Sequence, residues 1–209
     1  MFTGIVTGTF PVVELNRRAG AASFGVQLDA RHVEGLQIGA SVSLEGVCMT
    51  VTRVEGTRAY FDASSETLAR TTLGRLQDGT RINVERSAKA GVEIGGHGVS
   101  GHVDGMATVV AVDRPENNCV LTFEVPEAYR RYVFNKGFVA LNGCSLTVCE
   151  FDKRTGRFRV YLIPETLRLT TFGELRPGDR VNFEIDRQTQ IIVDTIDAAV
   201  ERALAGKKQ

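Results

Sequence analysis

The chain has 209 residues, 43% of them hydrophobic, and its 25 basic side chains balance its 25 acidic ones. Zero net charge removes the attraction to phosphate backbones that a basic domain has, so nucleic acid is not an expected partner. No apolar run approaches the roughly 20 residues of a membrane span, and the N-terminus lacks the features of a secretion signal, so no membrane association is expected.

In the first half of the chain, short apolar or alternating runs separated by Gly, Asn and Asp predict β-strands. These runs cover residues 12–15, 23–28, 41–44, 49–54 and 58–62. The Glu-Thr-Leu segment after Asp62 predicts one short helix, and Gly74 suits its end. Regularly spaced short strands of this kind are typical of a barrel or a sandwich.

The second half of the chain repeats the first. The octapeptide LEGVCMTV at residues 44–51 returns as LNGCSLTV at residues 141–148, a shift of 97 (141 minus 44). Residues 62–74 match residues 161–173 with a shift of 99 (161 minus 62). The two extra residues (99 minus 97) fit best in the polar stretch 152–156, because loops tolerate insertions.

Predicted strands of the second half lie at residues 109–112, 120–125, 139–141, 146–151 and 157–163. Its short helix begins at Pro164, which suits a first helical turn, and Gly173 suits its end. A repeat period of about 100 residues is the size of a complete small domain. We therefore predict an all-β protein with two similar tandem barrels, residues 1–96 and residues 97–188, each carrying a short helix.

The last segment, residues 189–209, has a different pattern and no counterpart after the first domain. Ile192, Ile196, Ala199 and Ala203 recur at three- and four-residue spacings, which predicts an amphipathic helix of about three to four turns. Two interpretations stay open. The helix packs on its own barrel, or it joins a small oligomeric bundle, often a trimer.

Strand alternation gives the repeated octapeptide an inner and an outer face. The inner face carries Val47, Met49 and Val51 in the first copy, so Cys48 and Thr50 point outward. In the second copy the same alternation puts Cys144 in the core and turns Ser145 and Thr147 outward. We interpret the paired glycines, Gly46 and Gly143, as marks of a ligand that approaches the outer face closely.

The cysteines and histidines do not predict a metal site. Cys48, Cys119, Cys144 and Cys149 form no CxxC pair, and only three histidines accompany them. Reduced cysteines are typical of a cytoplasmic protein, and the absence of a glycine-rich phosphate loop predicts no nucleotide cofactor. His102, which replaces Ile5 of the first copy, is a candidate site residue, although a lone histidine is often structural.

Taken together, several segments resemble the riboflavin synthase (alpha subunit) family. They are the start MFTGIV, the segments Gly95-Gly96-His97 and Ser100-Gly101-His102, residues 141–148, the segment IPETL at residues 163–167, and Asp186 with Gln188-Thr189-Gln190. The stretch Gly95–Gly98 also suits a linker turn between the domains. The resemblance covers about residues 1–200.

This resemblance implies two six-stranded antiparallel Greek-key barrels and a C-terminal helix that holds a homotrimer. It implies that two molecules of 6,7-dimethyl-8-ribityllumazine exchange a four-carbon unit in the last step of riboflavin biosynthesis. The products are riboflavin and 5-amino-6-(D-ribitylamino)uracil, and no cofactor or metal takes part. Association with lumazine synthase is left open.

The resemblance also implies the site residues, one lumazine on each barrel, with a complete site between the first barrel of one subunit and the second barrel of its neighbour. The implied catalytic residues are Cys48, His102, Ser145, Thr147 and Asp186. The implied substrate-binding residues of the first barrel are Gly4, Ile5, Val6, Ser41, Cys48, Met49, Thr50, Asp62, Ala63, Ser64, Ser65, Glu66 and Thr67. Those of the second barrel are Gly101, His102, Val103, Lys136, Ser145, Leu146, Thr147, Tyr161, Leu162, Ile163, Pro164, Glu165 and Thr166.

Positions where the two copies differ can divide the roles of donor and acceptor. The four pairs are Cys48 and Ser145, Ile5 and His102, Gly39 and Lys136, and Ser87 and Asp186. We hypothesise that a nucleophile (thiolate, hydroxide or a ribityl hydroxyl) adds at C7 of the lumazine on the Cys48 barrel. The barrel with His102, Ser145 and Thr147 would hold the lumazine whose C7 methyl group loses a proton. The rival interpretation is a lumazine-binding antenna protein that shares the fold and catalyses nothing.

Overall fold

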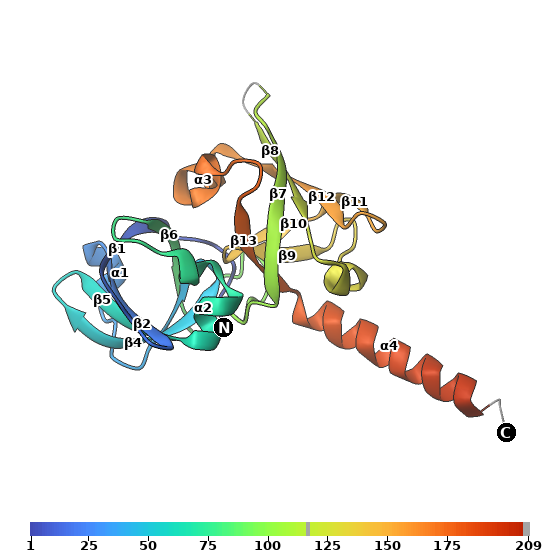
Figure 1. Ribbon diagram of the computed structural model, residues 1–209, viewed down its shortest axis with the longest axis horizontal. Coiled ribbons are helices and arrows are strands. Elements are labelled where there is room, and N and C mark those ends of the chain that lie inside the picture. Colours follow the sequence, from blue (N-terminus) through green and yellow to red (C-terminus); the bar gives the residue numbers. More distant parts are fainter. Residues whose placement is uncertain (116–117, 207–209) are drawn as a thin grey trace.

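A computed structural model describes residues 1–115 and 118–206 of the chain (Figure 1). The first domain is a closed, antiparallel barrel with the strand order β1-β2-β5-β4-β3-β6. Its strands are β1 (Gly8–Arg18), β2 (Ala21–Gln27), β3 (Ser41–Leu44), β4 (Val47–Glu55), β5 (Arg58–Ser64) and β6 (Arg81–Arg86). The connections carry α1 (Ala30–Val33), α2 (Ser65–Arg70) and the 3-10 helix η1 (Thr72–Arg75).

The second domain is a seven-stranded antiparallel sheet with the order β10-β9-β13-β7-β8-β12-β11. Its strands are β7 (Gly105–Asp113), β8 (Cys119–Glu124), β9 (Phe138–Leu141), β10 (Cys144–Thr147), β11 (Cys149–Asp152), β12 (Arg157–Leu162) and β13 (Arg180–Ile185). Its helical connections are η2 (Glu127–Tyr132), α3 (Pro164–Leu169) and η3 (Thr171–Glu174). The order repeats that of the first barrel, with β10 and β11 in the place of β4.

A single strand was predicted at residues 146–151, but the structure has two strands there, β10 and β11. The chain leaves the ladder at Val148, and Glu150 has a left-handed backbone with φ of 51°. The insertion predicted at residues 152–156 is confirmed. The β4–β5 turn contains residues 56–57, between the pair Glu55 and Arg58, whereas the β11–β12 turn contains residues 153–156.

Two strands, β6 and β13, were missed by the sequence pattern. In β6 the side chains of Ile82, Asn83, Val84 and Glu85 are all buried, so polar residues occupy one covered face of the strand. This face lies against other parts of the molecule, where Asn83 donates a hydrogen bond to the Asn142 carbonyl at 3.0 Å. Alternating apolar and polar residues here do not distinguish a buried face from a solvated one.

The short helices α2 and α3 confirm the helices predicted after Asp62 and from Pro164, which lies in the first turn of α3. The first barrel also has α1, which was not predicted. The predicted stop at Gly74 is wrong. α2 already ends at Arg70, and Gly74 lies inside η1, where an added Cβ would collide with the Leu68 carbonyl. The requirement for glycine is therefore the close approach of two helical turns.

The hairpins β3–β4 and β9–β10 meet at the contact between the barrels. Each has a two-residue turn with positive φ at both residues: Glu45 and Gly46 (50° and 82°), and Asn142 and Gly143 (44° and 80°). A Cβ on Gly46 would lie 2.5 Å from the Gly143 nitrogen. The interpretation of these glycines as a sign of ligand approach is therefore wrong, because what approaches each turn is the turn of the other barrel.

The segments that precede the two barrels are exchanged between them. Phe2 and Val99 form an antiparallel bridge, and beyond it each segment crosses to the opposite barrel. Val6 lies in the core of the second barrel, and Val103 packs against the core of the first. Two equivalent glutamates hold the crossings: Glu85 accepts hydrogen bonds from Thr3 and Gly4, and Glu184 accepts them from Ser100 and Gly101.

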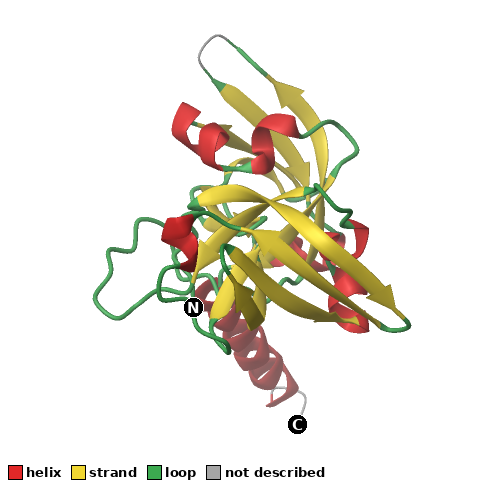
Figure 2. Cartoon of the chain, turned by 90° about the vertical axis from the view of Figure 1, so that its left-hand side faces the viewer, coloured by secondary structure: helices red, strands yellow, loops and turns green. Residues whose placement is uncertain are grey.

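The C-terminal helix α4 (Arg187–Gly206) has 20 residues and is longer than predicted. It extends away from both barrels (Figures 1 and 2) and leaves Ile192, Ile196, Val200 and Leu204 exposed, so the interpretation that its apolar face packs on its own barrel is wrong. Its contacts with the barrel are polar and involve η2: Arg131 forms ion pairs with Asp194 and Asp197, and Tyr132 donates a hydrogen bond to Asp194 at 2.7 Å. No helix among the described residues is long and apolar enough to cross a membrane.

Candidate active site

The outward face of β4 is built as strand alternation predicts. Val47, Met49 and Val51 are buried in the first barrel, whereas Thr50 is exposed and Cys48 is partly exposed. The neighbouring strand β3 places Ser41 directly opposite Thr50. The face therefore offers a thiol and two hydroxyl groups beside one another.

The outward face of β10 is the equivalent surface on the second barrel. Ser145 is partly exposed and Thr147 is exposed, while Cys144 is buried in the core as predicted. Burial raises the pKa of the Cys144 thiol to about 12, so this cysteine is a packing residue. Phe138, which corresponds to Ser41, lies opposite Thr147 and is 47% exposed.

The exchanged segments complete these faces in a way that differs from the expectation. The Cys48 backbone nitrogen donates to the Gly101 carbonyl at 2.8 Å, and the Ser145 nitrogen donates to the Gly4 carbonyl at 2.8 Å. Residues 4–6 therefore adjoin the Ser145 face, and residues 101–103 adjoin the Cys48 face. The expected placement of Gly4–Val6 on the first barrel and of Gly101–Val103 on the second is therefore corrected for the backbone, because each segment crosses over. The His102 side chain nevertheless lines a cavity with His97, Phe138 and Asp186.

Several expected substrate-binding residues turn their side chains into the barrel cores. These residues are Val6, Met49, Ala63, Leu146 and Leu162, each 9% exposed or less. Their side chains hold the faces in place, and only their backbone atoms can reach a ligand on the outer surface.

The ends of β5 and β12 contribute exposed groups next to each face. Ser64 caps α2 by accepting a hydrogen bond from the Thr67 nitrogen at 3.2 Å, and Asp62 is exposed. On the second barrel, Tyr161 and Ile163 are exposed at the start of α3. Among the remaining expected residues of these helices, the Glu165 carboxylate is engaged by Arg168 at 2.6 and 2.8 Å, which lowers its pKa.

Lys136 occupies the backbone position that Gly39 occupies in the first barrel. Both residues are in the left-handed region, with φ of 66° and 86°, and their nitrogens donate equivalent hydrogen bonds to Val148 and Val51. A lysine in this conformation is strained, and strain of this kind is retained mainly at functional positions. Its side chain is exposed beside the Ser145 face.

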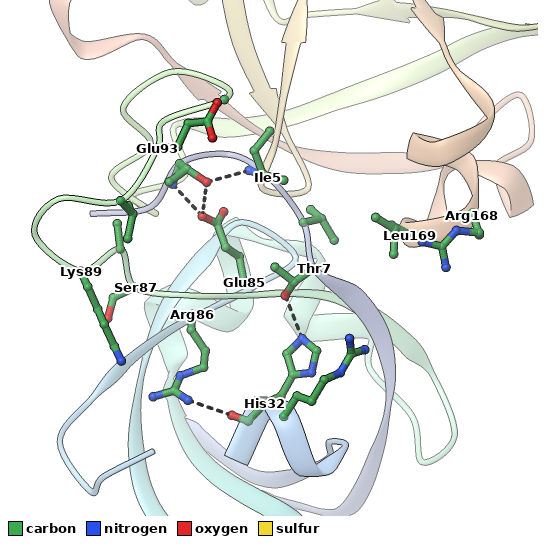
Figure 3. A pocket seen from close by; sticks show the side chains of 16 residues that line it. Ile5, Thr7, His32, Glu85, Arg86, Ser87, Lys89, Glu93, Arg168 and Leu169 are labelled. Carbon is green, nitrogen blue, oxygen red and sulfur yellow. Dashed lines mark hydrogen bonds between the residues drawn. The ribbon is translucent and has the colours of Figure 1, made fainter. Parts of the chain in front are cut away.

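Two cavities are lined by equivalent segments of the two halves of the chain. The first has a volume of about 930 Å³ and contains Thr3, Ile5 and Ser87 in its lining (Figure 3). The second has a volume of about 540 Å³ and is lined at the corresponding positions by Ser100, His102 and Asp186. Two of the four positions at which the copies differ therefore lie in the same cavity. They are occupied by Ile5 and Ser87 in the first cavity, and by the ionisable residues His102 and Asp186 in the second.

His97 was missed as a site residue, because the glycines around it indicated a linker turn. It lines the second cavity, is only 9% exposed, and its Nδ1 lies 2.6 Å from the Ser145 hydroxyl oxygen. Burial lowers the pKa of the imidazole, and the charge of Asp186 opposes this effect. A residue in an irregular segment has no periodicity that would indicate its role. Only the contact of His97 with Ser145, in the second copy of the octapeptide, reveals it as a site residue.

Asp186 caps the start of α4. Its carboxylate accepts hydrogen bonds from the Thr189 hydroxyl at 2.6 Å and from the Thr189 nitrogen at 3.1 Å. Burial raises the pKa of Asp186, but these bonds, the Gln188 nitrogen and the nearby His97 lower it overall. The side chain therefore carries a negative charge into the second cavity. Within residues 1–115 and 118–206, no three metal-binding side chains lie close enough together to hold an ion.

Comparison with known proteins gives consistent matches over the whole chain. The lumazine binding domain family matches twice, at residues 3–87 and 100–186. Riboflavin synthase of Escherichia coli (strain K12) is 45% identical over 209 residues, which are 100% of this chain and 95% of that protein. Riboflavin synthase of Chlamydia pneumoniae is 41% identical over 196 residues, covering 94% of this chain and 95% of that one.

Solved structures match the fold. The crystal structure of LumP complexed with riboflavin has a TM-score of 0.83 at 23% identity, over 90% of this chain and 100% of that chain. The crystal structure of LumP complexed with 6,7-dimethyl-8-(1'-D-ribityl) lumazine has a TM-score of 0.79 at 23% identity, over 88% and 98%. At this identity the likeness establishes the two-barrel architecture.

Proposed function

Because the chain belongs to the riboflavin synthase family and carries the lumazine binding domain twice, we propose that its two outward faces hold two molecules of one substrate. The enzyme is a transferase that converts two molecules of 6,7-dimethyl-8-ribityllumazine into riboflavin and 5-amino-6-(D-ribitylamino)uracil. The observation that carries the site assignment is the repeated face itself, with Cys48 and Thr50 on one barrel and Ser145 and Thr147 on the other.

A dismutation of two identical molecules needs two similar poses with different chemical surroundings. The equivalent faces supply the similar poses, and correct mutual orientation of two reactants is worth several kcal/mol. The different surroundings come from the four divergent positions. The second barrel has His102, Asp186 and Lys136 where the first has Ile5, Ser87 and Gly39.

These differences support the following division of roles. The lumazine at Cys48 and Thr50 accepts a nucleophile at C7, and the lumazine at Ser145 and Thr147 loses a proton from its C7 methyl group. The ring delocalises the resulting carbanion, so modest general-base assistance is sufficient.

We also propose a cytoplasmic homotrimer held by α4. The exposed apolar side chains of this helix have no partner among the described residues of one chain, and a helical bundle would cover them. All four cysteines are free, as expected in a reducing compartment. In such an assembly the Cys48 face of one copy meets the Ser145 face of its neighbour.

The activity is tested by incubating the purified chain with 6,7-dimethyl-8-ribityllumazine as the only substrate. We expect one riboflavin for every two lumazines consumed, with no added cofactor. Tight binding without conversion would instead identify a lumazine-binding antenna protein. A chain that neither binds nor converts the compound would refute the proposed function.

The nucleophile is tested with Cys48→Ser. If the thiolate adds at C7, the variant loses roughly 10²-fold or more in kcat, because a hydroxyl is a much weaker nucleophile at neutral pH. If the face only positions the substrate, kcat changes little. Undiminished turnover would therefore eliminate the thiolate and retain hydroxide or a ribityl hydroxyl.

A further inference from the structure

The Ser145 hydroxyl has a specific partner that its counterpart in the first barrel lacks. His97 Nδ1 lies 2.6 Å from Ser145 Oγ, a short distance for a neutral hydrogen bond. We propose that His97 is the positioning residue of Ser145: its neutral imidazole accepts the Ser145 hydroxyl proton and makes Oγ the proton acceptor on the second barrel. This proposal deepens, and rests on, the function proposed above.

Both members of the His97–Ser145 pair are held in place. The His97 ring stacks on Phe138 with a centroid distance of 5.4 Å and an interplanar angle of 18°. The chain also passes close to Ser145, since a Cβ on Gly96 would lie 2.8 Å from the Ser145 Cβ. The stacking restrains the imidazole and the close backbone restrains Ser145, so Nδ1 and Oγ stay near each other.

The charges around His97 suit an imidazole that alternates between neutral and protonated. Its surroundings in the second cavity include three ionisable side chains, Asp186, Arg187 and His102. Burial lowers the pKa of His97, which keeps Nδ1 free to accept a proton at neutral pH. The Asp186 carboxylate favours the protonated form, so it stabilises an imidazolium when one is generated during turnover.

The first barrel has no equivalent of this pair. Cys48, which corresponds to Ser145, has no side-chain hydrogen bond within the part of the chain that the structure describes. The only buried histidine of that barrel, His32, instead contacts Thr7 and Asp29, at 2.9 and 2.7 Å. The two faces are therefore alike in shape but differ in their capacity to take up a proton.

The Ser145–His97 pair accounts for the deprotonation step with every proton and electron pair assigned. Ser145 Oγ takes a proton from the C7 methyl group of the lumazine while its own proton moves to His97 Nδ1. The C–H electron pair stays on the substrate as a delocalised anion, and the histidine becomes an imidazolium beside Asp186. The proton returns by the reverse path or passes to solvent through the cavity.

The test measures two quantities in each variant: riboflavin formation, and exchange of the C7 methyl protons of bound lumazine with D₂O. His97→Phe keeps the stacking on Phe138 and removes Nδ1, and we expect both rates to fall roughly 10²-fold with little change in KM. His97→Asn keeps a hydrogen-bonding group near Nδ1 but cannot be protonated. In the parent, protonation of the imidazole lowers the rate at low pH. We expect this loss of rate to be absent in His97→Asn.

A double-mutant cycle with Ser145→Ala shows whether His97 acts through Ser145. We expect His97→Phe to cause no further loss once Ser145 is replaced. The proposal would be overturned if His97→Phe lowered the rate equally with and without Ser145→Ala. It would also be overturned if His97→Asn lost rate at low pH as the parent does. His32→Phe is the matched control, because it also removes a buried histidine bonded to a hydroxyl, and it should retain turnover. Failure of the unaltered chain to form riboflavin would refute the function itself, which separates the two conclusions.

Discussion

Glu45 and Asn142 occupy the same position in the two hairpin turns, yet only Glu45 can ionise. Each side-chain oxygen accepts a hydrogen bond from a strand nitrogen, Asn83 for Glu45 at 2.6 Å and Asn182 for Asn142 at 2.7 Å. Glu45 is 6% exposed, and burial raises its pKa to about 8, opposed by Asn83 and Thr171. The carboxyl is therefore mainly protonated at neutral pH, which makes it similar to the amide of Asn142.

This residue predicts a loss of stability with rising pH. The folded pKa of about 8 lies above the ordinary glutamate pKa of 4.5, so the contribution of Glu45 is complete below pH 4.5 and is lost as pH rises through 8. The full loss is roughly 5 kcal/mol. We expect Glu45→Gln to be more stable than the parent at pH 8.5 and to flatten this part of the profile in urea unfolding.

The control for Glu45 is Glu93→Gln, which neutralises an exposed carboxylate on the loop after β6. It should leave the slope of stability against pH unchanged. If Glu45→Gln shows the same slope between pH 5 and 8 as the parent, the carboxyl does not titrate at the barrel contact and the assignment is wrong.

At the scale of elements, α4 is the part of the chain that most needs a partner. Ile192 and Ile196 are 58% and 56% exposed, and Val200 and Leu204 extend the same stripe. The sequence pattern gave the amphipathic face correctly. It did not decide between the two possible coverings, because an apolar stripe has the same period whether it faces its own barrel or another chain.

We expect the double substitution Ile192→Asp with Ile196→Asp to abolish the proposed trimer without unfolding the barrels. Two buried charges destabilise a helical bundle, whereas both side chains are exposed in one chain. Sedimentation should show monomers, and far-ultraviolet circular dichroism should retain the β signal. The matched control is Ala198→Asp, which adds a charge on the opposite side of the helix and should preserve the assembly. An unchanged mass in the double variant would remove α4 from the interface.

At the scale of the whole molecule, the two barrels are joined by reciprocal contacts. The turns meet at Gly46 and Gly143, the side chains of Asn83 and Asn182 each donate to the carbonyl of the opposite turn, and the first segments are exchanged. Because the Gly101 carbonyl completes the Cys48 face, neither half of the chain contains a complete face by itself. Duplication of the domain is thus coupled to formation of the site.

The turn contact predicts a specific sensitivity to added volume. Gly46→Ala places a Cβ 2.5 Å from the Gly143 nitrogen, and we expect it to destabilise the protein by about 1–3 kcal/mol more than Gly79→Ala. Gly79 has nearly the same φ, 84° against 82°, but nothing within 4 Å of its added Cβ, so the backbone cost cancels in the comparison. Thermal unfolding at equal protein concentration gives the difference, and equal effects would mean that the turns do not pack tightly.

The sequence by itself determined the features that depend on near neighbours. Strand alternation placed Cys48, Thr50, Ser145 and Thr147 outward, and the internal repeat gave the two domains, the short helices and the inserted turn. These follow because the period of a strand or helix is a local property of the backbone.

Only the tertiary structure decided which segments meet. The strands β6 and β13, the meeting of Gly46 with Gly143, the crossing that brings Gly4 to Ser145 and Gly101 to Cys48, and the contact of His97 with Ser145 each join residues far apart in the chain. They depend on how two barrels dock, and docking leaves no period in the sequence, because the atoms that touch belong to different elements.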